Sequence, residues 1–208
     1  MQDFPVHLPL DLDHASKLIH LRFEKLDAEK FSAGLLPLNS TDFAERFRDL
    51  PRKMHRYLFQ DILSNAGSYR SKEDLGGGYI FFGTQQRFRG FIPDEISAGV
   101  KDACSHLKKN DPDPISSVVH FYQHFVFVHP FYDANGRIGR FISTIYLDYH
   151  GFHISWRMMH ENQRWLKKLN SCHLRVGQEN FEKYMHRLRA HWKKNIFRKS
   201  DIDPIPNE

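Results

Sequence analysis

The feature that most constrains this fold is an apolar run that ends at a proline. Residues 118–128 read "VVHFYQHFVFV", and His129 and Pro130 follow directly. Because a proline ring disfavours helical geometry in the residue before it, a helix through this run is expected to end at about His129. Such a run carries apolar side chains around most of a helix, so other elements must pack against it.

A second helix is predicted immediately after a short loop. The segment 129–140 reads "HPFYDANGRIGR", and apolar residues then recur on one side of a helix up to Tyr149, before Gly151. Asn135 and Gly136 fall where this second helix begins. The free backbone N–H groups of a helix start, together with the helix dipole, favour the binding of an anion.

The side chains of this loop suit a metal-bound polyphosphate. Gly136 allows a ligand to approach the backbone closely, and Arg137 and Arg140 lie three residues apart on one helical face, where both can donate to phosphate oxygens. Asp133 can hold Mg²⁺ as a single carboxylate together with substrate phosphates. His129 has an ordinary pKa of about 6.5 and can accept a proton near neutral pH. The favoured reaction is therefore the attack of a hydroxyl on phosphorus.

The rest of the chain predicts a mainly α fold with one β-hairpin. N-terminal helices are expected within 13–48, as one helix over 14–31 and a short one from Ser40 or Thr41, and Pro51 is expected to start a new helix. The aromatic and β-branched stretch 79–92 predicts a hairpin. Further helices are predicted over 93–109 and 114–128, with C-terminal helices within 155–198, at 155–170 and 180–195.

Length and composition favour one soluble domain spanning 1–208. The chain has 208 residues, of which 40% are hydrophobic, and a formal net charge of +5 that is spread along the sequence. Cys104 and Cys172 stand alone, without the spacing of a zinc site or a disulfide framework. The N-terminus shows no basic region followed by a continuous apolar stretch. We therefore expect a cytoplasmic protein that is not associated with a membrane.

The loop resembles the signature of the Fic family, HPFx[D/E]GNGRxxR. The matching positions are His129, Pro130, Phe131, Asp133, Asn135, Gly136, Arg137 and Arg140. Ala134 departs from it, where the family usually has glycine. The stretch "LFQDILSNAGSYR" resembles the helix and loop that precede the family's flap, and the predicted hairpin stands where that flap belongs. The resemblance covers about residues 50–170, the core of a Fic-type helical bundle.

The resemblance implies a protein adenylyltransferase that transfers AMP from ATP to a Ser, Thr or Tyr hydroxyl of a target protein. It implies that His129 is the general base and that Asp133 binds Mg²⁺. It implies that the α- and β-phosphates are held by Asn135, Gly136 and Arg137. Arg140 would reach the terminal phosphate, and Phe131 would anchor the loop. The flap would bind the target segment along its strand edge, through Tyr79, Ile80, Phe81, Phe82, Phe88 and Arg89.

Other transfers of the Fic type remain open, namely of UMP, phosphate or phosphocholine, as does a non-catalytic module that binds nucleotide or protein. Ala134 also occurs in the Doc-like branch, which reads "DANKR" and transfers a terminal phosphate. Gly136 stands here in place of that lysine and leaves the phosphate position open, which favours adenylylation. The intact His129 argues against a pure binding module.

Regulation and partners are less constrained. Fic proteins are often inhibited by a glutamate that pairs with the second arginine; Glu45 and Glu179 each match that inhibitory motif in part. His120 and His124 have a spacing that suits a metal, but packed boundary histidines explain them better. Nucleic acid is not an expected partner, because basic and aromatic residues are not interleaved beyond the hairpin. A homo-oligomer or a regulatory partner stays open.

Overall fold

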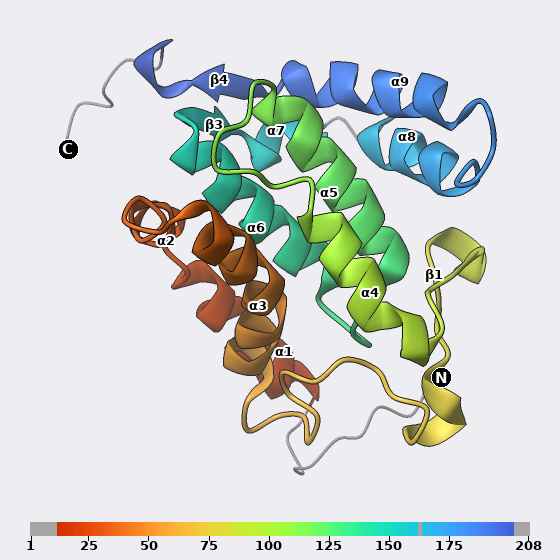
Figure 1. Cartoon of the computed structure of the whole chain (residues 1–208). Coiled ribbons are helices and arrows are strands. Elements are labelled where there is room, and N and C mark those ends of the chain that lie inside the picture. The colour runs from red at the N-terminus through yellow and green to blue at the C-terminus, as the bar shows by residue number, and fades with distance from the viewer. Residues whose placement is uncertain (1–11, 162–163, 202–208) are drawn as a thin grey trace.

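The computed structural model describes residues 12–161 and 164–201, and it is mainly helical, as the sequence predicts (Figure 1). The helices are α1 (Leu12–Glu24), α2 (Ala28–Ala33), α3 (Ser40–Phe59), α4 (Pro93–Cys104), α5 (Pro114–Val128), α6 (Asn135–Tyr149), α7 (Trp156–Glu161), α8 (Arg164–His173) and α9 (Phe181–Lys193). The strands are β1 (Phe81–Phe82), β2 (Phe88–Arg89), β3 (Phe152–Ile154) and β4 (Ile196–Arg198), and short 3₁₀ turns lie at Leu75–Gly78, Thr84–Gln86 and Lys199–Asp201.

The two helices that flank the loop form the centre of the fold. α5 and α6 lie side by side through the middle of the molecule (Figure 1), and α4 and α9 pack against α5 while α2 and α3 pack against α6. Phe121 and Phe125 of α5 and Ile138 and Ile142 of α6 are fully buried. The apolar run identified in the sequence is therefore the central helix, and its covering by other helices fixes the position of the loop at its end.

The prediction of one helix over 14–31 was wrong. α1 ends at Glu24, and α2 begins at Ala28. Asp27 separates them because its carboxylate accepts a hydrogen bond of 3.0 Å from the backbone N–H of Lys30, which makes it the N-cap of the second helix. Asp13, expected as a cap, lies inside the first turn of α1.

The prediction that Pro51 starts a new helix was also wrong. α3 runs without a break from Ser40 to Phe59 through Pro51, which is buried. A proline inside a helix leaves the carbonyl four residues earlier without its N–H donor. Here the thiol of Cys104 in α4 lies 3.4 Å from that carbonyl, the oxygen of Phe47, and donates to it. A side chain from another helix thus replaces the lost donor.

The predicted hairpin is present, and a second small sheet was not foreseen. β1 and β2 are antiparallel, with Phe81 opposite Arg89 and Phe82 opposite Phe88. β3 and β4 are also antiparallel, and they join the end of α6 to the segment after α9. The stretch expected as one helix over 155–170 is occupied by α7 and α8, between which residues 162–163 are not described.

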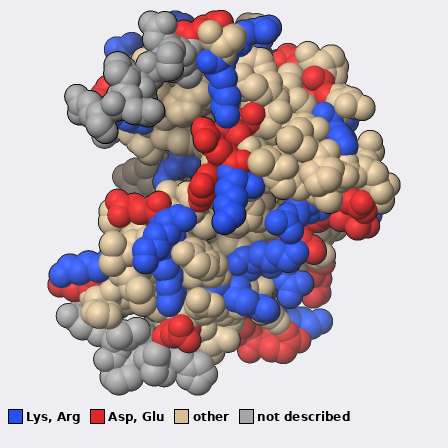
Figure 2. Space-filling view, turned by 90° about the vertical axis from the view of Figure 1, so that its left-hand side faces the viewer, with Lys and Arg blue, Asp and Glu red and all other residues tan. Residues whose placement is uncertain are grey.

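The surface agrees with a net charge that is spread out. Figure 2 shows the face that carries α2 and α3, where basic side chains lie over the middle and lower part with acidic ones among them. Within residues 12–161 and 164–201, no helix combines the length and the apolar character that crossing a bilayer requires.

Candidate active site

His129 lies at the end of the central helix in a left-handed conformation. Its φ of 53° and ψ of 59° make it the C-cap of α5, and its backbone N–H still donates to the oxygen of Phe125 at 3.2 Å. The helix cannot continue, because Pro130 follows. The predicted end of the helix at His129 is therefore confirmed, and the imidazole is carried on a backbone that turns sharply into the loop.

The imidazole of His129 is held in one orientation. Its Nδ1 lies 3.2 Å from the carbonyl oxygen of Val126, so this nitrogen carries the proton and Nε2 keeps its lone pair. The ring also stacks on Phe82 of the hairpin, with centroids 4.1 Å apart and an interplanar angle of 13°. Burial lowers the pKa of His129 to about 4, and Arg70 acts in the same direction. The ring is accordingly a neutral proton acceptor at pH 7.

Asn135 closes the loop rather than reaching out of it with its side chain. Its Oδ1 accepts from the backbone N–H of Phe131 at 3.0 Å, and its Nδ2 donates to the oxygen of the same residue at 2.8 Å. Phe131 is buried and stacks on His55 at 4.1 Å. The role of Phe131 as an anchor follows from these contacts. For a phosphate, Asn135 therefore offers its backbone N–H.

The start of α6 forms a cradle for an anion. The N–H groups of its first residues, Asn135, Gly136 and Arg137, have no acceptor within the helix. A Cβ placed on Gly136 would lie 3.8 Å from the hydroxyl of Tyr122 and 4.0 Å from Nη1 of Arg140. The Tyr122 hydroxyl and the Arg140 guanidinium therefore lie beside the partly exposed backbone of Gly136. Tyr122 was not singled out from the sequence, since it reads as one more aromatic of an apolar run.

Ala134, the residue that departs from the signature, adopts a backbone conformation that is typical of glycine. Its φ of 63° and ψ of 5° are left-handed, and its methyl group is buried. The loop thus keeps a turn that glycine adopts more easily. Asp133 supports it, because its Oδ1 accepts from the N–H of Ala134 at 2.5 Å.

Asp133 has the position that a magnesium ligand would need. Its carboxylate is about half exposed and pairs with Arg137, with Oδ2 3.0 Å from Nη2. One carboxylate beside a phosphate site is a usual arrangement for Mg²⁺, which keeps several waters and substrate oxygens. Over the described ranges, no three His, Cys, Asp or Glu side chains are grouped to hold a metal. The donor set therefore fits an ion brought in by a polyphosphate.

Comparison with known proteins identifies the family. The sequence model of the Fic/DOC family matches residues 48–147, which include the whole loop, all of α5 and most of α6. Residues 48–147 form a Fic/DOC family domain. No curated protein sequence matches it.

Solved structures show that the Fic fold extends beyond the matched residues. A Fic-domain-containing signaling protein from Bacteroides thetaiotaomicron VPI-5482 is 16% identical, with a TM-score of 0.59 over 91% of this chain and 72% of that one. The N-terminal Fic domain of a Bep effector from Bartonella sp. AR 15-3 is 17% identical, with a TM-score of 0.58 over 91% and 86%. BepC from Bartonella tribocorum, with bound AMPPNP, is 13% identical, with a TM-score of 0.53 over 86% and 87%.

Arg70 connects the Fic loop to the hairpin, and the sequence did not mark it as a site residue. It is 2% exposed, and its guanidinium donates to the carbonyl oxygens of His129 at 2.8 Å, of Phe91 at 3.0 Å and of Gly78. Its backbone N–H donates to the oxygen of Pro130 at 3.0 Å. Burial lowers the pKa of Arg70 to about 10, so the side chain stays charged at neutral pH. The sequence feature that could have indicated this role is the position of Arg70 in "GSYR", just before the hairpin.

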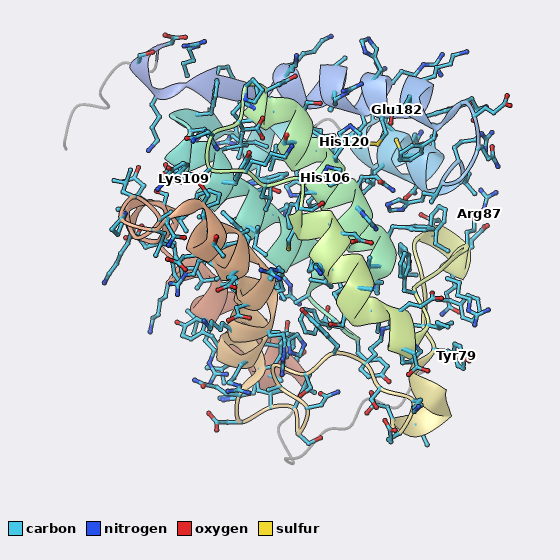
Figure 3. All side chains as sticks on the ribbon, in the orientation of Figure 1. Tyr79, Arg87, His106, Lys109, His120 and Glu182 are labelled. Carbon is cyan, nitrogen blue, oxygen red and sulfur yellow. The ribbon has the colours of Figure 1, made fainter. Side chains whose placement is uncertain are left out.

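The hairpin residues predicted as a target-binding flap divide between two faces. Tyr79 and Phe81 are about half exposed, and Tyr79 lies at the outer edge of the molecule (Figure 3), where the Arg89 guanidinium is 4.8 Å from its ring. The inward face is formed by Ile80, Phe82 and Phe88. The outer face is thus exposed, while the inner face covers His129.

The last residue of α8 supports the inner face of the hairpin. His173 is buried and meets Phe82 and Phe88 edge-on, with centroids 5.8 and 5.2 Å apart. Burial lowers its pKa to about 4, and the nearby His129 adds to this effect. A C-terminal helix therefore holds the flap against the Fic core.

The contacts of Glu45 and Glu179 give no support to an inhibitory role. Glu45 lies 3.7 Å from Arg48 and lines a cavity of about 690 Å³ between α3 and α4, whereas Arg140 lies over the Trp156 ring at 5.9 Å. Glu179 is exposed in the turn between α8 and α9. His120 of α5, considered as a metal ligand, is partly exposed, and its ring lies 5.3 Å from that of His106, which follows α4 (Figure 3).

Proposed function

We propose that this Fic protein is an adenylyltransferase, which transfers AMP from ATP to a hydroxyl of a target protein in the presence of Mg²⁺. The observation that carries the proposal is a neutral imidazole, fixed by the Val126 carbonyl, on the residue that leads into an anion-binding helix start. This arrangement places a base next to a phosphate site, as an attack on phosphorus requires.

His129 would act as the general base. With the proton of its Nδ1 directed to Val126, the lone pair of Nε2 accepts the proton of the target hydroxyl as its oxygen attacks the α-phosphorus. The bond between the α-phosphorus and the oxygen leading to the β-phosphate breaks, and pyrophosphate leaves with that electron pair. Burial by Phe82 keeps the imidazole neutral and excludes water from this step.

The start of α6 would hold the polyphosphate. The backbone N–H groups of Gly136 and Arg137 lie at the positive end of the helix dipole, where a negatively charged phosphate is favoured. The Arg140 guanidinium provides a forked hydrogen-bond donor beside them. These groups are in place before any substrate arrives, because the Asn135 side chain and the buried Phe131 fix the turn. A preformed site of this kind stabilises charge that develops during transfer.

Mg²⁺ would be held by Asp133 together with the phosphates. The ion neutralises charge on the phosphate oxygens when it is bound. The carboxylate of Asp133 also pairs with Arg137, which keeps this arginine beside the phosphate site.

Gly136 favours AMP transfer over phosphate transfer. Gly136 carries no side chain, and a Cβ added there would already be in van der Waals contact with the Tyr122 hydroxyl and Arg140. A lysine side chain at this position, as in the Doc-like reading, would fill the space beside them. The AMPPNP bound to BepC, a protein of the same fold, supports an ATP-like substrate.

The test is a transfer assay with ATP labelled at either the α- or the γ-phosphorus. Wild-type protein and His129→Ala are incubated with Mg²⁺ and a cell lysate as the source of targets. We expect label from the α position only, reduced about 10²- to 10⁴-fold in the variant, which is the usual contribution of a general base.

Two results would contradict the proposal. Label from the γ position alone would identify a kinase of the Doc type. Absence of His129-dependent label from either position, with ATP binding intact by calorimetry, would favour the binding module or a donor other than ATP.

A further inference from the structure

The two C-terminal helices α8 and α9 carry basic residues on faces that adjoin each other. Arg164, Lys167 and Lys168 of α8 are spaced so that they share one face of the helix. On α9, which packs against α8, the matching face carries Arg187 and His191, with Lys194 at its end. Both helices thus contribute to one cationic surface, here called the α8–α9 surface.

This surface is hollowed by two adjoining cavities. One, of about 490 Å³, is lined by Met158, Glu161, Arg164, Lys168, His191, Lys194 and Asn195. The other, of about 480 Å³, is lined by Arg164, Lys167, Lys168, Ser171, Tyr184 and Arg187. They share Arg164 and Lys168, so both belong to one recess.

Among the described residues that line the two cavities, Glu161 is the acidic one, and its carboxylate is paired with Arg157 at 3.1 Å. Glu182 of α9 lies instead on the side of that helix toward His120 of α5 (Figure 3), where it approaches Arg189 at 3.8 Å. Lys167, Lys168, Arg187 and Lys194 therefore give the recess positive charge that favours the binding of an anion.

His191 forms part of the wall of the recess. The residue is 8% exposed and lines the first cavity, while its Nε2 is buried and has no hydrogen-bond partner among the described residues. Burial lowers the pKa of His191, and Lys168 and Lys194 add to the effect. Burial and these two cations therefore both oppose protonation of the imidazole.

We propose that the α8–α9 surface binds an acidic segment of a partner protein, rich in Asp and Glu. α8 has ten residues and is about 15 Å long, which corresponds to about four or five residues of extended peptide. Carboxylates at alternate positions would reach the lysines and arginines of both cavities.

A single-stranded nucleic acid fits this surface less well. Binding of that kind combines a basic groove with aromatic rings on which bases stack. Among the residues that line the two cavities, Tyr184 is the one aromatic, and its ring already lies 5.2 Å from the Arg175 guanidinium and 5.4 Å from that of Arg187.

The test measures binding of a fluorescein-labelled octaglutamate peptide to the full chain by anisotropy, at low and at physiological salt. The variant Lys168→Gln/Lys194→Gln removes two charges from the recess. The matched control, Lys183→Gln/Lys193→Gln, removes two exposed charges of α9 that line neither cavity. We expect the first variant to bind at least about tenfold more weakly and the control to bind within about twofold of wild type, since charged contacts in a recess act at short range.

Three outcomes would overturn the proposal: no binding of octaglutamate, equal weakening by both variants, or tighter binding of an octauridylate RNA of the same length with the same dependence on Lys168 and Lys194. The measurement is repeated with His129→Ala, which should bind octaglutamate like the wild type. A failure of the transfer assay and a failure of this binding are therefore distinguishable.

Discussion

Ala134 shows how a single residue strains the Fic turn. An L-residue in left-handed geometry costs roughly 1–2 kcal/mol, while glycine loses about 0.5–1 kcal/mol more conformational entropy on folding. Replacing the alanine, whose φ is 63°, should therefore give a net gain. We predict that Ala134→Gly raises the free energy of unfolding by about 0.5–1 kcal/mol, measured by urea denaturation.

The control for this prediction is a buried alanine with helical geometry. Ala103 lies in α4 and is fully buried, so Ala103→Gly should destabilise the protein by about 1 kcal/mol. If Ala134→Gly is also destabilising, the left-handed turn is not the source of strain, and its buried methyl group contributes more than the backbone costs.

The pKa of His129 leads to a second prediction at the level of one residue. Burial lowers this pKa to about 4, so the neutral form dominates from neutral pH down to about pH 5. We predict that the imidazole signals of His129 in an NMR titration shift near pH 4. Replacing the stacked Phe82 with Ala should expose the ring and move this pKa upward, toward about 6.5. A wild-type midpoint near 6.5 would show that the flap does not cover the imidazole in solution.

At the scale of the elements, Arg70 connects the loop after α5 with the hairpin. Its guanidinium binds carbonyl groups of the loop and of both ends of the hairpin, which a lysine ammonium cannot reach with the same fork. We predict that Arg70→Lys loosens the hairpin and speeds hydrogen exchange at the N–H groups of Gly90 and Phe91, which donate to Ile80 and Val128. Exchange at buried positions of α5 and α6 should change less. Uniformly faster exchange would instead indicate global destabilisation, without a specific role at the flap.

A double-mutant cycle can test whether the Cys104 thiol replaces the backbone N–H donor that Pro51 lacks in α3. Cys104→Ala removes the thiol that donates to the Phe47 carbonyl and should cost about 1–3 kcal/mol, as for an unsatisfied buried acceptor. In a Pro51→Ala background the backbone N–H of residue 51 can reach that carbonyl, so the cost of Cys104→Ala should fall. Additive effects of the two substitutions would show that the thiol is not the replacement donor.

The elements that depend on neighbours in the sequence were predictable, and those that depend on distant residues were not. The end of α5 at His129 and the start of α6 at Asn135 follow from Pro130 and from the turn residues beside it. The continuity of α3 requires a thiol from another helix, and the pairing of β3 with β4 joins segments separated by three helices. No local pattern encodes either contact.

The same distinction applies to the site. His129, Asp133 and the residues of the α6 start were found because they share one short motif. The roles of Arg70 and His173, and the Tyr122 hydroxyl beside Gly136, depend on how separate elements meet. The Asn135 side chain is hydrogen-bonded to the backbone of Phe131, four residues earlier. A sequence motif shows that an asparagine is present, but it does not show whether the side chain or the backbone N–H is left to bind a ligand.

At the scale of the whole molecule, buried histidines link stability to pH. Burial lowers the pKa values of His55, His129 and His173 to about 4, below the value of about 6.5 expected in the unfolded chain. Between these values the unfolded state binds more protons than the folded state, so the free energy of unfolding decreases as the pH falls. These residues lie behind Phe131, at the end of α5 and at the end of α8, so the effect acts on the core and the flap together.

We predict that the free energy of unfolding falls steeply between pH 7 and pH 5, by about 2 kcal/mol for each of the three histidines. Replacing His173 with Phe keeps an aromatic ring against Phe82 and Phe88 but removes the group that can be protonated. The fall in the free energy of unfolding between pH 7 and pH 5 should then be smaller by the contribution of one histidine, about 2 kcal/mol. Urea denaturation of both proteins at pH 7 and pH 5 measures the difference. An unchanged slope would mean that His173 is protonated without unfolding, and hence that α8 separates from the flap in acid while the helical core remains folded.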